Sequence, residues 1–125
     1  MNKAVILPLY KAPHFAEQVT DWIWQAFGEG LPRAFFHSIV EHSQTPGALP
    51  LTFIAVDGEQ LLGTVGLWRC DLITRQDLCP WLAALYVDEA ARGKGLAGKL
   101  QQHVIAFAAQ AGYDELHLWS ACRDF

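Results

Sequence analysis

The chain has 125 residues, of which 52% are hydrophobic and 18% are charged, and its formal net charge at pH 7 is −4. This length and composition exclude a disordered chain and predict a single globular domain over residues 1–125. The net negative charge argues against nucleic acid binding. No apolar run approaches the roughly 20 residues that a membrane span requires.

Eight elements are predicted, in the order β-α-α-β-β-β-α-β. Short apolar runs indicate the strands, and apolar residues spaced three and four apart indicate the helices. The elements span, in chain order, residues 3–9, 14–27, 32–43, 51–56, 61–70, 80–87, 95–111 and 116–120. Two helices followed by a hairpin exclude a simple doubly wound sheet. The predicted fold class is α/β (α+β), a mixed sheet flanked by helices.

Local signals sharpen parts of this outline. The pair Asp57-Gly58 is typical of a hairpin between two strands. Gly63 and Gly66 interrupt the second of these strands and suggest a bulge or a bend. Trp22 and Trp24 lie two residues apart on a predicted helix and cannot share a face, so we expect Trp24 to be half exposed.

The cysteines and the N-terminus indicate the cell compartment. The three cysteines are odd in number and show no C-x-x-C spacing, which favours neither a disulfide framework nor a zinc site. The apolar run at residues 4–8 is too short for a signal peptide. We therefore expect a cytoplasmic protein without a metal ion.

A glycine cluster follows the strand at residues 80–87 and opens the next helix. Glycines allow the backbone to take positive φ and to approach a ligand closely. No Ser, Thr, Asp or Asn between Arg92 and Ala97 can cap the helix, so its first N–H groups are left for water or an anion. Arg92 and Lys94 add positive charge at the same place. The segment is therefore a candidate site for a diphosphate.

Several interpretations compete for these glycines. Residues 93–98 fit G-x-G-x-x-G, but only 27 residues follow Gly98, too few to continue a dinucleotide-binding sheet. The P-loop pattern requires Ser or Thr where Leu100 stands. A plain strand-to-helix turn without a ligand is the remaining alternative.

A family resemblance gives the most specific interpretation. Residues 92–97 resemble the pattern Gln/Arg-x-x-Gly-x-Gly/Ala of the GNAT N-acetyltransferase superfamily, and residues 85–87 match the position of its coenzyme-contacting strand. Residues 80–87 also resemble one bacterial branch of that superfamily. The resemblance implies a GNAT-like mixed sheet and acetyl-CoA as co-substrate, with main-chain contacts to its pantetheine arm and diphosphate. The residues implied to bind coenzyme A are Leu85, Tyr86, Val87, Arg92, Gly93, Lys94, Gly95, Leu96, Ala97 and Gly98.

The resemblance implies transfer of an acetyl group to an amine of a small molecule or peptide by direct attack, but it leaves the catalytic residues unassigned. Ala83 and Ala84 stand where the family often has an acid. Substitute bases are Glu59, Asp71 and Asp77. No tyrosine matches the family's general acid, so a coenzyme A-binding module with little or no turnover is the alternative.

The end of the chain departs from the family pattern. The last helix and strands of a full GNAT fold are not expected here, because the sequence stops shortly after the strand at residues 116–120. That strand would present an apolar edge, which favours pairing with another chain. We therefore expect a homodimer that closes this edge, or a truncated form.

Overall fold

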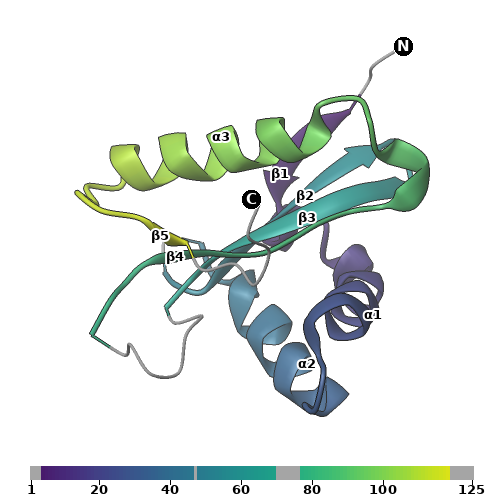
Figure 1. Ribbon diagram of the computed structural model, residues 1–125, viewed down its shortest axis with the longest axis horizontal. Helices are drawn as coiled ribbons and strands as arrows, with labels where there is room; N and C mark the ends of the chain where they lie inside the picture. The colour runs from purple at the N-terminus through teal and green to yellow at the C-terminus, as the bar shows by residue number, and fades with distance from the viewer. Residues whose placement is uncertain (1–3, 47, 70–76, 119–125) are drawn as a thin grey trace.

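The computed structural model describes residues 4–46, 48–69 and 77–118 and has the predicted order of elements (Figure 1). Short 3-10 turns lie between several of these elements: η1 Leu9–Lys11, η2 Pro13–Phe15, η3 His42–Gln44 and η4 Glu89–Ala91. The strands are β1 Val5–Pro8, β2 Leu51–Asp57, β3 Gln60–Trp68, β4 Trp81–Val87 and β5 His117–Leu118. The helices are α1 Ala16–Phe27, α2 Arg33–Glu41 and α3 Leu96–Gln110.

The five strands form one mixed sheet in sequential order, β1-β2-β3-β4-β5. The first three neighbouring pairs are antiparallel, and β5 lies parallel to β4. A parallel neighbour requires a crossover, which α3 provides between β4 and β5. The expected mixed sheet with flanking helices is therefore confirmed.

Helices cover both faces of the sheet (Figure 1). On one face, α3 buries Leu96, Leu100, Val104 and Ala108 against side chains of β2, β3 and β4. On the other face, α1 and α2 pack over a second buried cluster. Its members from the two helices are Val19, Ile23, Phe36 and Val40. Burial of two faces explains why the central strands read as nearly continuous apolar runs.

Several predicted boundaries and faces need correction. The first helix begins at Ala16 rather than residue 14, because Pro13–Phe15 form a 3-10 turn. Helical periodicity predicts that Phe27 and Phe35 lie on the apolar faces of their helices, but they are 44% and 47% exposed. Both lie near the α1–α2 connection. The same periodicity leaves His103 outside the apolar face of α3, yet it packs edge-on against Phe53 with ring centroids 5.0 Å apart.

The predicted hairpin is present, with a tighter turn than expected. Asp57 pairs with Gln60, so only Gly58 and Glu59 form the loop. The pairing of β2 with β3 shifts by one residue beside Gly63, which confirms the expected irregularity. The last predicted strand is described only as His117–Leu118, and the rest of that prediction lies outside the described residues.

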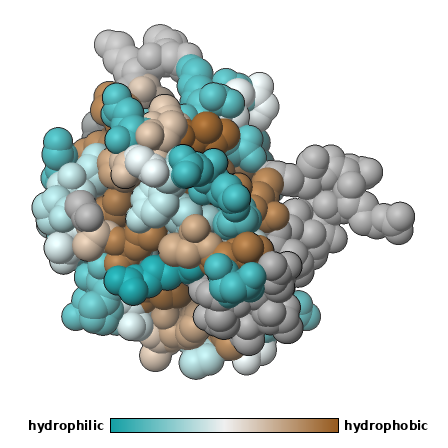
Figure 2. Space-filling view, turned by 90° about the vertical axis from the view of Figure 1, so that its left-hand side faces the viewer, coloured by the Kyte–Doolittle hydropathy of each residue, from teal (hydrophilic) through white to brown (hydrophobic). Residues whose placement is uncertain are grey.

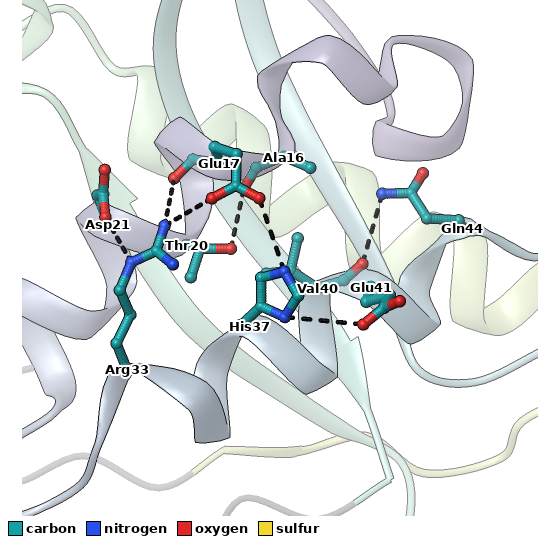
Figure 3. A network of polar contacts seen from close by, with 9 residues as sticks. All are labelled: Ala16, Glu17, Thr20, Asp21, Arg33, His37, Val40, Glu41 and Gln44. Atoms are coloured by element: carbon teal, nitrogen blue, oxygen red, sulfur yellow. Dashed lines mark hydrogen bonds and ion pairs between the residues drawn. The ribbon is translucent and has the colours of Figure 1, made fainter.

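A network of ion pairs joins α1 to α2 (Figure 3). Arg33 donates to Asp21 at 2.7 Å and to Glu17 at 2.8 Å. The other oxygen of Glu17 lies 3.6 Å from His37, which is also 3.6 Å from Glu41. Hydrogen bonds to Glu17, and then to Asp21, raise the pKa of Arg33. The network fixes the start of α2 on α1.

Candidate functional site

The glycine loop connects the end of β4 to the start of α3. After the 3-10 turn Glu89–Ala91, the backbone reverses direction at Gly93 and Gly95, whose φ angles are +82° and +79°. These angles lie in the left-handed region that glycine adopts without strain. Gly98 has no positive φ and belongs to the first turn of α3. Gly93 and Gly95 therefore form the turn, and Gly98 leaves the first turn of α3 without a side chain at that position.

The start of α3 has free hydrogen-bond donors. The first hydrogen bond of the helix runs from Lys99 N–H to Gly95 O, at 3.2 Å. The amides of Leu96, Ala97 and Gly98 precede this bond, and no side chain caps them. A Cβ built on Gly93, Gly95 or Gly98 would meet no atom of the described residues within 4 Å. Open space thus faces an uncapped helix N-terminus, an arrangement that fits a diphosphate.

Arg92 and Lys94, the two cationic residues of the glycine loop, have different surroundings. Arg92 donates from Nε to Val87 O at 2.8 Å, and its guanidinium carbon lies 5.5 Å from the centroid of the Tyr86 ring. Lys94 is exposed and has no ion-pair partner within the described part of the chain. The sequence placed both charges together, whereas the structure turns Arg92 back towards β4.

A bulge in β4 lies directly before the predicted coenzyme-contacting residues. Thr64 of β3 pairs with Tyr86, but Gly66 pairs with Ala83, so β4 contains one extra residue here. Ala84 has a φ of +53°, the one positive value among the described non-glycine residues. Ala83 and Ala84 consequently both pack on the α1–α2 side of the sheet.

The bulge decides which face Tyr86 occupies. Leu82 packs on the α3 side, and strict alternation from Leu82 would place Tyr86 on the same side. The extra residue reverses this, and Tyr86 instead meets Trp22 of α1 edge-on, with ring centroids 5.3 Å apart. Sequence reasoning predicted neither the bulge in β4 nor the contact between Trp22 and Tyr86. The adjacent small residues Ala83 and Ala84 were the available signal for the bulge, and they were interpreted only as the absence of a catalytic base.

The outer edge of β4 is paired along part of its length. Among the described residues, β4 pairs with β5 only through Trp81 with His117 and Leu82 with Leu118. No described strand lies beside the outer edge of β4 from Ala83 to Val87. This segment could therefore offer main-chain hydrogen bonds to an extended ligand, as in β-strand addition.

The candidate bases do not gather at the bulge. Glu59 lies on the β2–β3 turn, where its carboxylate is 3.3 Å from His14. It precedes Gly66, the partner of Ala83, by seven residues, or about 20 Å along an extended strand. Asp77 is exposed just before β4, and Asp71 lies outside the described residues. No catalytic base is assigned.

An apolar groove of about 450 Å³ lies between α3 and β5. It is lined by Leu82, Gln101, Ile105, Leu116 and Leu118. Leu118 and Ile105 are 48% and 45% exposed. Figure 2 shows the end of the molecule where α3 meets β5, with apolar surface lying between polar side chains.

The described residues form neither a metal-ligand cluster nor a membrane-spanning helix. Within residues 4–46, 48–69 and 77–118, no group of three or more His, Cys, Asp or Glu side chains is placed to hold a metal ion. No helix in this part of the chain is both long and apolar enough to cross a bilayer.

Comparison with protein families decides the classification. The sequence model of the Acetyltransferase (GNAT) family matches residues 16–124. This chain belongs to the GNAT acetyltransferase family. No curated protein matches the sequence closely enough to be identified as a relative.

Solved structures share the GNAT fold with this chain. Aminoglycoside N-acetyltransferase AAC(6')-Iy, in complex with a bisubstrate analogue, matches with a TM-score of 0.75 and 19% identity over 98% of this chain and 83% of its own. A predicted acetyltransferase from Clostridium acetobutylicum with acetyl-CoA matches with a TM-score of 0.70 and 13% identity, covering 94% and 80%. Ribosomal-protein-alanine N-acetyltransferase from Brucella melitensis matches with a TM-score of 0.59 and 22% identity, covering 92% and 76%. These likenesses establish the fold.

Proposed function

We propose that this protein is an N-acetyltransferase that uses acetyl-CoA as co-substrate and a small-molecule or peptide amine as acceptor. The observation that carries the proposal is the uncapped start of α3 facing open space, directly after two glycines with positive φ. Family membership supports acetyl transfer in general. Structural neighbours that hold coenzyme A, acetyl-CoA or a bisubstrate analogue support the choice of carrier.

The proposed coenzyme site uses mainly main-chain groups. The amides between Gly93 and Gly98 would bind the diphosphate, and Lys94 would add a screened positive charge. The backbone of β4 from Leu85 to Val87 would bind the pantetheine arm. Because the donors are backbone N–H groups, binding depends on the shape of the loop more than on its side chains.

The proposed reaction is a direct acyl transfer. The neutral amine attacks the thioester carbonyl, a C–N bond forms and the C–S bond breaks. The nitrogen then loses one proton, and the sulfur gains one and leaves as the free thiol of coenzyme A. An N–H group near the β4 bulge, close to Leu85, would stabilise the negative charge that develops on the carbonyl oxygen. The acceptor ammonium must first lose its proton, either to a water chain or to a base that is not assigned.

Two measurements test the proposal. Coenzyme A and acetyl-CoA are expected to raise the melting temperature in proportion to RT ln(1 + [L]/Kd), whereas NAD is expected to leave it unchanged. Release of free thiol from acetyl-CoA in the presence of a panel of amines would demonstrate turnover. Binding without turnover would favour the alternative of a coenzyme A-binding module, which the apolar surroundings of Ala83 and Ala84 also support. A chain that binds neither form of the coenzyme contradicts both.

A homodimer is proposed at the α3–β5 end of the molecule. The exposed Ile105 and Leu118 border the apolar groove there, and a second copy could cover both. Sedimentation at micromolar concentrations is expected to show a dimer that Leu118→Glu dissociates. A wild-type monomer at high concentration would contradict this.

A further inference from the structure

Arg92 connects three elements of the candidate site. Its Nε–H donates to Val87 O at 2.8 Å, and its guanidinium lies over the ring of Tyr86. The same ring meets Trp22 of α1 edge-on at 5.3 Å. One side chain therefore joins the glycine loop to the end of β4 and, through Tyr86, to α1.

This geometry differs from that of a phosphate ligand. An arginine that binds phosphate presents its planar fork of donors to the anion, often in a bidentate manner. Here Nε is engaged by the Val87 carbonyl, and the guanidinium plane is placed near an aromatic ring. Lys94, two residues later, is exposed and has no such contacts within the described chain. The two cations of the loop are thus not equivalent.

The bond from Arg92 to Val87 spans residues 88–92, which connect the end of β4 to the glycine loop. The β4 bulge at Ala84 and the cradle from Gly93 to Gly98 are separated by the end of β4 and by residues 88–92. One end of that link is fixed by Asp88 N–H, which donates to Leu62 O at 2.8 Å. The other end precedes Gly93, whose φ of +82° lies in the region that glycine adopts without strain. Two contacts hold this second end: Ala91 is buried in the cluster that includes α3, and the Arg92 side chain bonds Val87 O of β4.

We propose that Arg92 is a positioning residue that sets the separation between the diphosphate cradle and the thioester end of β4, and that it is not a ligand of the diphosphate. The proposal rests on the proposed function, because only a ligand that contacts both the diphosphate cradle and β4 would bind more weakly when their separation changes. Coenzyme A spans both ends. Adenosine 5′-diphosphate (ADP) carries the diphosphate but lacks the pantetheine arm, so it probes the cradle alone.

Arg92→Lys is the decisive variant, because it keeps the charge and removes both the Nε–H donor and the planar guanidinium. We expect the affinity for coenzyme A to fall about tenfold, the loss of one charge-assisted contact, while the affinity for ADP stays unchanged within error. Calorimetry or ligand-observed NMR would measure both. If Arg92 held the diphosphate by its charge, Arg92→Lys would retain both affinities and Arg92→Gln would weaken both by the same factor.

Lys94→Gln provides the matched comparison from the same loop. It removes one charge that has no described partner, so it is expected to weaken coenzyme A and ADP equally and to lose its effect at high salt. Equal behaviour of the Arg92 and Lys94 variants towards the two ligands would overturn the positioning role.

Variants of Tyr86 test the same contact without altering a charge. Tyr86→Leu removes the ring under the guanidinium, whereas Tyr86→Phe keeps it. Tyr86→Leu is expected to reproduce the selective loss of coenzyme A affinity and to be non-additive with Arg92→Lys. Additive effects would contradict the proposal. A wild-type protein that binds neither ligand refutes the proposed function, whereas one that binds both and keeps its coenzyme A affinity in Arg92→Lys refutes the positioning role alone.

Discussion

Gly95→Asp tests the diphosphate cradle most directly. Gly95 is the N-cap of α3 and has φ +79° and ψ 11°. A Cβ there would meet no described atom within 4 Å, so the structural cost is mainly the left-handed backbone conformation, about 1–2 kcal/mol. Asp tolerates this conformation better than most residues do. The variant is therefore expected to fold, with a modestly lower melting temperature.

The effect on binding should be larger than the effect on folding. Two unit charges 4 Å apart repel by about 1 kcal/mol in water and about 4 kcal/mol at an effective dielectric constant of 20. Next to a diphosphate, the Asp carboxylate should weaken coenzyme A binding by about fivefold to about a thousandfold. The carboxylate can also cap the free amides of α3 and compete with the anion for them.

Isothermal titration with coenzyme A would measure this loss. Gly95→Ala is the control, because it also places a Cβ at this left-handed position but carries no charge, and it should keep most of the affinity. Equal affinities of Gly95→Asp and Gly95→Ala for coenzyme A would show that no anion binds beside Gly95, and the reasoning about the cradle would fail.

Three further predictions concern stability. Burial against Phe53 lowers the pKa of His103. Below about pH 6.5 the unfolded state therefore binds a proton that the folded state does not, so the free energy of unfolding should fall as the pH drops. Unfolding of His103→Gln, followed as a function of pH, should lack this decrease. Thr52→Val removes the acceptor of Trp68 Nε1 at 3.3 Å, so chemical denaturation should show a loss of roughly 1–3 kcal/mol that Thr52→Ser largely avoids. Arg33→Ala removes the ion pairs between α1 and α2 and should lower the urea midpoint, with a smaller difference at high salt; a salt-independent difference would assign the effect to lost packing.

The order of the elements could be predicted from local signals. Helical spacing, the Asp57-Gly58 turn and the glycines after β4 each depend on residues close in sequence, and the structure contains all of these features. The faces of helices were less predictable. His103 and Phe27 were misplaced because burial depends on how each helix lies on the rest of the fold, and helical periodicity does not report that arrangement.

The sequence by itself determined the fold class, the family pattern and the position of an uncapped, glycine-rich helix start, because these depend on backbone preferences within a few residues. Only the tertiary structure decided what surrounds that start. The extra residue at Ala84 turns Tyr86 towards Trp22, and Arg92 then bonds Val87 O beside the Tyr86 ring. Strand register and contacts between distant elements fix these directions, since a shift of one residue moves every following side chain to the opposite face.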